Sequence, residues 1–288
     1  MLTSPKNPWI KQLRKLHQAK YRRSQQQFLL EGTHLLQEAM VTQYPLTAVC
    51  ATPDWQARHQ ELWAQLQGHS ERQELVSAEV MNAIATTATP DGVVAIAPQK
   101  PGLSSISSMP QLGIALENLQ DPGNLGTLIR TAAAINSDGL WLTDNSVDVT
   151  HPKVLRASAG QWFRVPKQML PDLPLQLTTW KNKGCQILAT AANGAVPYWD
   201  VDFTQPTVLL LGNEGNGLST EMLTTASQII AIPMASTVES LNVGVAAAVI
   251  LFEAVRQRRV AGLNSEFALS LQHSSLSPPL PPLPPPLS

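Results

Sequence analysis

Three segments in the second half of the chain place small and polar residues directly after an apolar run. In the first, Leu116 leads into the turn Asp121-Pro122-Gly123, then Asn124, with Arg130 six residues further on. Asn124 stands where a helix N-cap is expected, and we predict a helix from Asn124 to Asn136. Asn124 is either only a cap or a group that also orients a ligand. Arg130 is either a surface charge or an anion-binding group.

The second segment follows the run Leu209–Leu211 and is the glycine-rich loop Gly212-Asn213-Glu214-Gly215-Asn216-Gly217. Glycine permits positive φ and a close approach of backbone to a ligand. In an open α/β sheet the ligand crevice lies beyond the carboxyl ends of the strands. Because the loop lacks both the G-x-G-x-x-G fingerprint and a P-loop lysine, the sequence disfavours nucleotide phosphate binding. It leaves open an adenosine site lined by backbone.

The third segment, Ile232-Pro233-Met234, continues to Ser240-Leu241-Asn242. Ser240 is predicted to cap a closing helix over Leu241–Arg258, which would put Asn242 in its first turn. Three such segments, each ending a strand, indicate one shared site more strongly than any of them alone.

Apolar runs that alternate with helical patterns must position these segments, and they predict a parallel α/β sheet with helices on both faces. The predicted strands of this half are Ile114–Leu116, Gly139–Leu142, Ile187–Thr190, Val208–Leu211 and Ile229–Ile232. A further short strand is predicted at Val93–Ala97.

Composition divides the chain into four regions. Residues 1–97 precede a Pro-, Gly- and Ser-rich stretch at 98–110, which we interpret as a linker. The α/β half follows over 111–262. Seven prolines separated only by leucines lie between Pro278 and Pro286, so we expect the tail 263–288 to be polyproline II or disordered. The tail is either dispensable or a ligand for a proline-recognition domain.

Composition also excludes several classes of protein. With 288 residues and 43% hydrophobic content the chain can build packed cores. Its longest apolar run, Val243–Phe252, is too short to span a bilayer, and the N-terminus has no apolar stretch typical of a secretory signal. Cys50 and Cys185 cannot form a disulfide framework or a four-ligand zinc site. We therefore predict a cytoplasmic protein without a metal.

The net charge of −1 conceals a basic arm at the N-terminus. Residues 1–30 contain no acid and seven of the 20 basic residues: Lys6, Lys11, Arg14, Lys15, Lys20, Arg22 and Arg23. Such a cluster is typical of a surface that binds RNA or DNA. The alternative is a solvated helix face.

The three segments contain N-L-G-T-L-I-R, G-N-E-G-x-G-L and I-P-M…S-L-N-V, in that order. This pattern resembles the SpoU (TrmH) branch of the SPOUT RNA methyltransferases over residues 112–260. The resemblance implies methyl transfer from S-adenosylmethionine to a ribose 2′-hydroxyl of rRNA or tRNA. It also implies a SPOUT-type parallel sheet with a C-terminal trefoil knot, and a homodimer. The first hundred residues are similar to the family's accessory RNA-binding domain, a small ribosomal-protein-like α/β unit.

The resemblance also implies roles for individual residues. The positions that match the family's catalytic residues are Asn124, Arg130, Glu214, Ser240 and Asn242. Those that match its methyl-donor site are Thr190, Leu211, Gly212, Ile232, Met234 and Leu241. One departure is Gly244, where relatives often have serine. In the family Arg130 is considered both a phosphate anchor and a proton acceptor. We favour the anchor, because a guanidinium holds its proton firmly and its fork suits phosphate.

Three alternatives remain from the sequence: a catalytically silent RNA-binding protein of the same fold, a nicotinamide- or ATP-dependent enzyme, and a base-modifying SPOUT relative. The complete set of five polar motif residues argues against the first, and the missing fingerprints argue against the second. The second segment differs from that of the base-modifying relatives. The accessory domain favours rRNA over tRNA as substrate.

Overall fold

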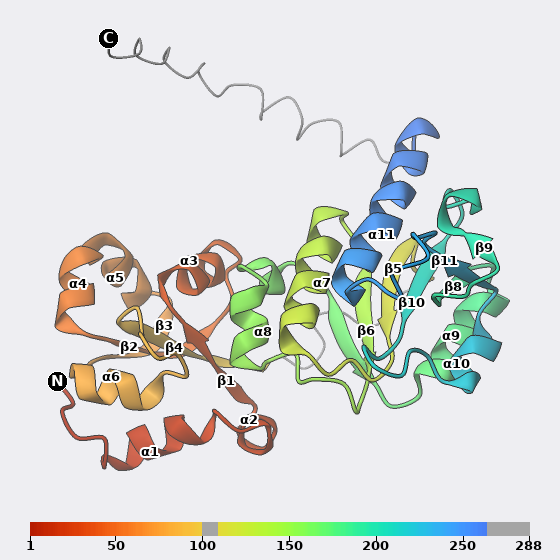
Figure 1. The fold of residues 1–288 in the computed structure, drawn as a ribbon. Helices are drawn as coiled ribbons and strands as arrows, with labels where there is room; N and C mark the ends of the chain where they lie inside the picture. The colour runs from red at the N-terminus through yellow and green to blue at the C-terminus, as the bar shows by residue number, and fades with distance from the viewer. Residues whose placement is uncertain (100–108, 264–288) are drawn as a thin grey trace, which may run out of the picture.

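The computed structural model describes residues 1–99 and 109–263, which form two α/β units side by side (Figure 1). Most of the predicted linker, and the predicted tail beyond Leu263, lie outside the described residues. Pro98, the first residue of that linker, belongs instead to a strand, where it pairs with Gln27. Among the described residues, no helix is long and apolar enough to cross a membrane.

The N-terminal unit is built on a four-stranded sheet in the order β1-β4-β2-β3. The strands are β1 (Gln27–Glu31), β2 (Leu46–Ala51), β3 (Ser70–Leu75) and β4 (Val93–Pro98). The central strand β4 is antiparallel to β1 and β2, and β3 is parallel to β2. The helices are α1 (Pro8–Lys15), α2 (Ala19–Gln25), α3 (Thr33–Val41), α4 (Pro53–Arg58), α5 (Gln60–Gln67) and α6 (Ala78–Ile84).

Alternation along β4 explains how this sheet is covered on both sides. Val94 and Ile96 pack with Ile10 of α1 and Ile84 of α6. The intervening strand residues face the opposite way and pack against α3, α4 and α5. Since successive side chains of a strand point to opposite faces, a wholly apolar strand such as β4 is suited to the centre of a layered sheet.

The C-terminal unit is built on a seven-stranded sheet, entirely parallel, in the order β7-β6-β5-β10-β8-β11-β9. The strands are β5 (Leu112–Leu116), β6 (Gly139–Thr143), β7 (Lys167–Leu170), β8 (Gln186–Thr190), β9 (Val196–Pro197), β10 (Thr207–Leu211) and β11 (Gln228–Ala231). The predicted parallel α/β fold is confirmed. The two edge strands β7 and β9 were not predicted.

Helices cover both faces of this sheet. They are α7 (Pro122–Ala134), α8 (Pro152–Ala157), α9 (Leu173–Asn182), α10 (Thr220–Thr225) and α11 (Val243–Val260), with short 3-10 turns η1 (Gln161–Phe163) and η2 (Tyr198–Asp200). Leu209 and Leu211 of β10 share a core with α7 and α11. Leu210, between them, packs with α9 and α10 on the other face.

The two units share one hydrophobic core across their seam. The ring of Trp162, in η1, lies 5.1 Å from that of Phe28 in β1 and 5.7 Å from that of Tyr44. Phe163 packs on Tyr44 from the same turn. Buried aromatic packing of this kind holds the two units as one body.

Candidate active site

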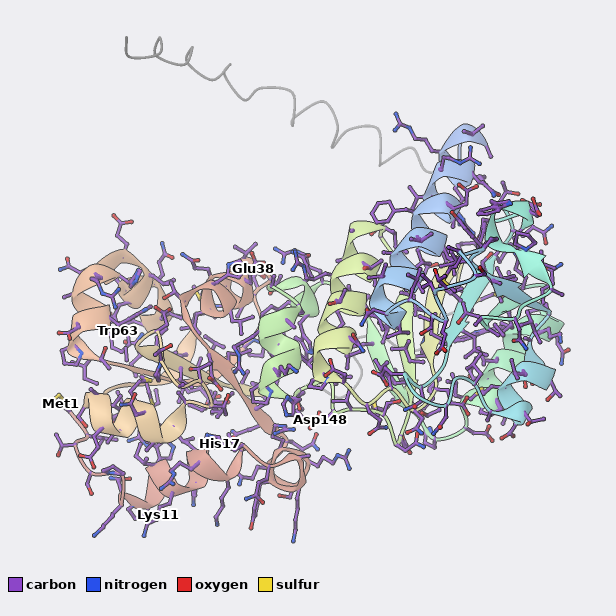
Figure 2. The ribbon with its side chains drawn as sticks, in the orientation of Figure 1. Met1, Lys11, His17, Glu38, Trp63 and Asp148 are labelled. Atoms are coloured by element: carbon purple, nitrogen blue, oxygen red, sulfur yellow. The ribbon has the colours of Figure 1, made fainter. Side chains whose placement is uncertain are left out.

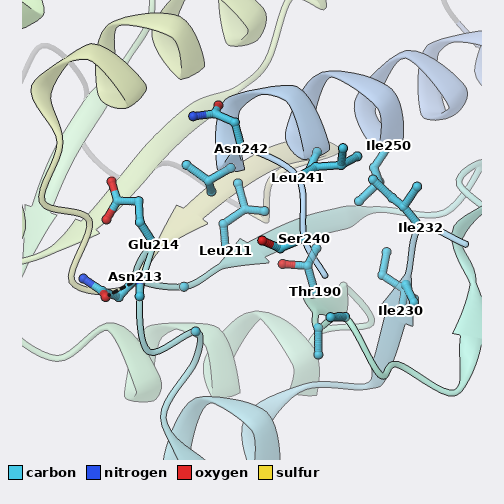
Figure 3. Close-up of a pocket in the computed structure, with 18 of the residues that line it drawn as sticks. Thr190, Leu211, Asn213, Glu214, Ile230, Ile232, Ser240, Leu241, Asn242 and Ile250 are labelled. Atoms are coloured by element: carbon cyan, nitrogen blue, oxygen red, sulfur yellow. Dashed lines mark hydrogen bonds between the residues drawn. The ribbon is translucent and has the colours of Figure 1, made fainter. Parts of the chain in front are cut away.

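A cavity of about 600 Å³ opens at the carboxyl ends of β8, β10 and β11 (Figure 3). Its apolar lining comes from Leu211, Ile230, Ile232, Leu241 and Ile250. The cavity lies beside the strand pair β5–β10. Here the strand order reverses, because the chain runs outward through β6 and β7 and then returns on the other side. Ligands of open α/β sheets bind at such a switch point.

The structure brings ten of the eleven motif residues predicted from the sequence to this cavity. They are Asn124, Thr190, Leu211, Gly212, Glu214, Ile232, Met234, Ser240, Leu241 and Asn242. Arg130 is the exception: it is exposed on α7, outside the lining.

Three polar side chains, one from each segment, form a hydrogen-bonded relay beside the cavity. Asn242 Nδ2 donates to Asn124 Oδ1 at 2.8 Å, and Asn124 Nδ2 donates to Glu214 Oε1 at 3.0 Å. The loops after β5, β10 and β11 therefore meet through side chains as well as through backbone.

The direction of this relay is fixed at both ends. Asn242 Oδ1 accepts from the backbone N–H groups of Gly244 at 2.9 Å and Val245 at 3.4 Å, so its amide nitrogen must face Asn124. Glu214, when ionised, can only accept. Hence the orientation of the Asn124 amide follows from the network around it.

The helix caps differ from those predicted. Asp121, not Asn124, caps α7, because Pro122 occupies the first helical position and the Asp121 carboxylate accepts from the Asn124 backbone N–H at 2.8 Å. Asn242, not Ser240, caps α11. Both corrections have one consequence: the Asn124 side chain and Ser240 are released from capping and line the cavity instead.

The Glu214 carboxylate is held by three donors. Oε1 accepts from the Asp121 backbone N–H at 3.0 Å as well as from Asn124, and Oε2 accepts from the Gln120 backbone N–H at 3.2 Å. Partial burial favours the neutral acid, but these hydrogen bonds outweigh it and lower the pKa of Glu214 below its usual value. Glu214 is therefore an anion at neutral pH and a poor general base.

The glycine-rich loop owes its shape to contacts that exclude a side chain. A Cβ on Gly212 would lie 2.3 Å from the carbonyl carbon of Gly217. Asn213 and Gly217 exchange two backbone hydrogen bonds of 2.9 Å, and Asn213 Oδ1 accepts from the Gly215 N–H at 2.9 Å. At its glycines the loop thus presents bare backbone to this side of the cavity, while Glu214 contributes its side chain to the relay.

The donor set fits an adenosine with an amino-acid tail. Apolar walls and exposed backbone suit a purine, and Thr190, Ser240 and Asn242 supply hydroxyl and amide groups for polar atoms. The volume lies within the ordinary range for a small-molecule site, roughly 300–1,000 Å³. Among the described residues, no group of three or more His, Cys, Asp or Glu side chains could hold a metal ion.

The basic arm forms α1, α2 and the chain around them. Lys6, Lys11, Arg14, Lys15, Lys20 and Arg23 are exposed. Arg22 is not: it is 1% exposed and bonded to Asp148 in the other unit. The expectation that Arg22 contacts RNA is wrong for this structure, because its guanidinium is enclosed between the units.

Sequence reasoning missed two residues that shape the site. Asp121 is the cap of α7, and the Asp-Pro pair before a helix was a signal for it. Asn213 anchors the glycine-rich loop by donating to the Asn118 carbonyl at 2.8 Å. Asn118 has a positive φ of 53°, a conformation that asparagine tolerates better than most residues.

Both units of the chain are similar to known proteins. The model of the SpoU rRNA Methylase family matches residues 111–252, and that of the MRM3-like substrate binding domain matches residues 7–95. An uncharacterized tRNA/rRNA methyltransferase of Synechocystis is 45% identical over 90% of this chain and 95% of its own. The chain belongs to the SpoU family. The resemblance drawn from the three motifs is thereby confirmed.

Two other relatives extend this family assignment. The 23S rRNA (guanosine(2553)-2′-O)-methyltransferase RlmP of Bacillus subtilis is 30% identical over 87% of this chain and 97% of its own. An AdoMet-bound rRNA methyltransferase from Sinorhizobium meliloti is 30% identical, covers 90% of this chain and 97% of its own, and has a TM-score of 0.78.

Proposed function

We propose that this SpoU protein is an S-adenosylmethionine-dependent methyltransferase that modifies a ribose 2′-hydroxyl in rRNA. The relay Asn242–Asn124–Glu214 at the rim of the cavity carries the proposal, because it unites the three segments that the family's activity requires. The activities of the relatives support the same reaction: one is a 23S rRNA 2′-O-methyltransferase, and another is an rRNA methyltransferase with AdoMet bound.

S-adenosylmethionine, when bound, supplies an electrophilic methyl group on a sulfonium centre. Leu211, Ile232 and Leu241 would enclose the adenine, with Gly212 giving close backbone contact and Thr190 and Met234 at the border. Ser240 and Asn124 would orient the ribose or the amino-acid end. Since such a displacement depends mainly on alignment, a fixed amide orientation at Asn124 is a direct contribution to the rate.

Arg130 lies on the same helix as Asn124, with its guanidinium exposed. It is available to RNA rather than to the enclosed donor, and we propose that it holds the phosphate beside the target ribose. Arg130→Lys should keep the charge but lose the planar fork, and therefore most of the activity. A near-wild-type rate for Arg130→Lys would contradict this role, and an unchanged kcat for Arg130→Ala would remove Arg130 from the mechanism.

The deciding experiment gives purified protein tritiated S-adenosylmethionine and total RNA from cells without the protein. Ribose-methylation mapping then locates the product. Label in rRNA that depends on Asn124 supports the proposal. Label only in tRNA would show that the substrate is tRNA and not rRNA. Binding of RNA without any methyl transfer would identify a catalytically silent relative.

We propose that residues 1–97 bind the RNA substrate through the exposed cations of α1 and α2, and that residues 111–262 perform the methyl transfer. The family match to a substrate-binding domain over residues 7–95 supports this division. The likeness of the first unit to a ribosomal protein, and a cytoplasmic location, remain predictions from the sequence.

We further propose a homodimer formed through α11. The helix exposes an apolar stripe at helical spacing, Val245, Val249 and Phe252, which Leu241 continues just before the helix begins. Each of these four residues is between 36% and 49% exposed. A second copy that covered this stripe would border the cavity, which Leu241 lines. Phe252→Glu should shift light scattering from dimer to monomer, whereas a monomeric wild-type protein would refute the dimer.

The trefoil knot is also a proposal. After β11, at the far side of β8, the chain returns to start α11 against α7 and β10, where Asn242 contacts Asn124. This return path past the glycine-rich loop supports the threading that the family resemblance implies.

A further inference from the structure

Arg22 links the RNA-binding arm to the catalytic unit. Its Nη1 donates to the carbonyls of Leu16 and His17, both at 2.9 Å, at the end of α1. Its Nη2 and Nε donate to Asp148 Oδ2 at 2.6 and 3.0 Å. One buried guanidinium thus fixes the end of the arm and a loop of the other unit at once.

Asp148 is equally constrained on its own side. Its Oδ1 accepts from the backbone N–H of Thr150 at 2.8 Å and from the Thr150 hydroxyl at 2.7 Å. Burial favours the neutral acid, but the Arg22 charge and the Thr150 hydrogen bonds outweigh it and lower the pKa of Asp148. The pair is therefore charged at neutral pH. Figure 2 places Asp148 at the junction of the units, on the same side as Lys11 and His17 of the arm.

The loop that carries Asp148 is bonded to the loop Asn118–Asp121, whose backbone N–H groups hold Glu214 of the relay. The Val147 N–H donates to the Leu119 carbonyl at 2.8 Å, and the Leu119 N–H donates to Ser146 Oγ at 3.2 Å. The next residue, Gln120, donates through its side chain to the Asn145 carbonyl at 2.9 Å and through its backbone to Glu214. Hydrogen bonds and adjacent residues therefore connect Arg22 to Glu214.

A second ion pair across the seam lacks this connection. Arg164, at the end of η1, pairs with Glu38 of α3. Figure 2 shows Glu38 at the opposite edge of the seam from Asp148. Among the described residues, the Arg164 guanidinium also donates to the carbonyl of Gly160, the residue that precedes η1, and not to the loops around the cavity. This pair is the control, because it joins the same two units elsewhere, with side chains that are more exposed than those of Arg22 and Asp148.

We propose that Arg22 and Asp148 are a positioning pair that sets the catalytic loop Asn118–Asp121 relative to the RNA-binding arm. The inference rests on the proposed methyl transfer. The pair touches neither RNA nor methyl donor, and it acts by keeping the loop that holds Glu214 and Asn124 in register with RNA bound on α1 and α2. Small misplacements of reacting groups lower rates strongly, up to about 100-fold for 1 Å.

The test compares Asp148→Asn with Glu38→Gln in the full-length protein. Asp148→Asn should lower kcat at saturating RNA about tenfold. The Kd for S-adenosylhomocysteine and the Kd for RNA should each stay within about threefold, because the exposed cations and the cavity are unchanged. Glu38→Gln should keep kcat within about twofold. The double variant Arg22→Gln with Asp148→Asn should lose no more than the worse single variant, since the two residues act as one unit.

Two results would overturn the inference. One is a normal kcat for Asp148→Asn with only weaker RNA binding, which would make the pair a simple support of the arm. The other is an equal loss of kcat in both variants together with lower melting temperatures, which would show general destabilisation.

Hydrogen exchange separates this inference from the proposed function. If the wild-type protein methylates no RNA, the proposed function fails. The positioning of the loop Asn118–Asp121 by Arg22 and Asp148 is then tested by hydrogen exchange at the Val147 and Leu119 amides. Faster exchange in Asp148→Asn but not in Glu38→Gln supports this positioning, and unchanged exchange in Asp148→Asn refutes it.

Discussion

Replacing Asn242 by aspartate separates two tasks of this residue. The Asp side chain keeps an oxygen for the N–H groups of Gly244 and Val245, so it still caps α11. It cannot donate to Asn124 Oδ1, as Asn242 Nδ2 does at 2.8 Å. If the Asn124 amide turned to satisfy the new carboxylate, its oxygen would instead face the anionic Glu214. Either arrangement leaves two acceptors opposed.

The expected loss of kcat in Asn242→Asp follows from the removal of one hydrogen bond at a half-exposed site. An acceptor left without its donor costs about 1–2 kcal/mol here, the low end for unsatisfied groups because water reaches the rim. If Asn124 has to hold its orientation in the transition state, kcat should fall roughly 5–30-fold. The free energy of unfolding should change by less than about 1 kcal/mol, because the cap is retained.

Two further substitutions make the comparison quantitative. Asn242→Ser also caps α11 and also removes the Nδ2 amide that donates to Asn124, but adds no charge, so it should lower kcat by a similar factor. Asn242→Ala loses the cap as well and should unfold about 1 kcal/mol more easily. The assay is tritium transfer to RNA at saturating donor, beside urea unfolding of each variant. A wild-type kcat in Asn242→Asp would refute the reasoning that the relay fixes Asn124.

The remaining predictions concern the loop, the arm and pH. Gly212→Ala should weaken S-adenosylhomocysteine binding about tenfold by calorimetry, since overpacking costs about 1–3 kcal/mol, whereas Gly215→Ala should bind normally because its Cβ would meet its nearest neighbour at 3.5 Å. Neutralising three exposed cations of α1 should weaken RNA binding and reduce the salt slope by about 0.7 for each phosphate that is no longer neutralised. These cations are Lys11, Arg14 and Lys15. The lowered pKa of Asp148 means that its stabilisation is complete above its unfolded-state pKa of about 3.9 and is lost as pH falls through the folded value. The unfolding free energies of wild type and Asp148→Asn should therefore differ most near neutral pH and converge in acid.

The sequence predicted the strands of the catalytic unit because buried parallel strands are continuous apolar runs. Val208–Leu211 and Ile187–Thr190 are of this kind, and the structure confirms both. The edge strand β7, with the sequence Lys-Gln-Met-Leu, has no such pattern, since only Leu170 in it is buried. Its pairing with β6 comes from tertiary position and not from local propensity.

The caps show where local rules stop. Ser240 and Asn242 are both good N-cap types, and Asn124 and Asp121 are another such pair. Local sequence cannot decide which residue of each pair caps the helix, because the choice depends on contacts with distant parts of the chain. Asn242, for example, is held by Asn124, which lies 118 residues away. In both cases the residue freed from capping lines the cavity. An error of two or three residues in a cap therefore changes the chemical role of a side chain.

Arg22 shows the same limit for charge. In the sequence it is one of seven cations, next to Arg23, and nothing local separates the two. Arg23 is exposed, while Arg22 is buried against an acid 126 residues away. Burying a guanidinium is costly unless its donors are matched, and here all three of its nitrogens have partners. Arg22 lies between the arm and the loop that supports Glu214. Because its burial is costly, we infer that it serves to set the geometry of the site and not to bind RNA.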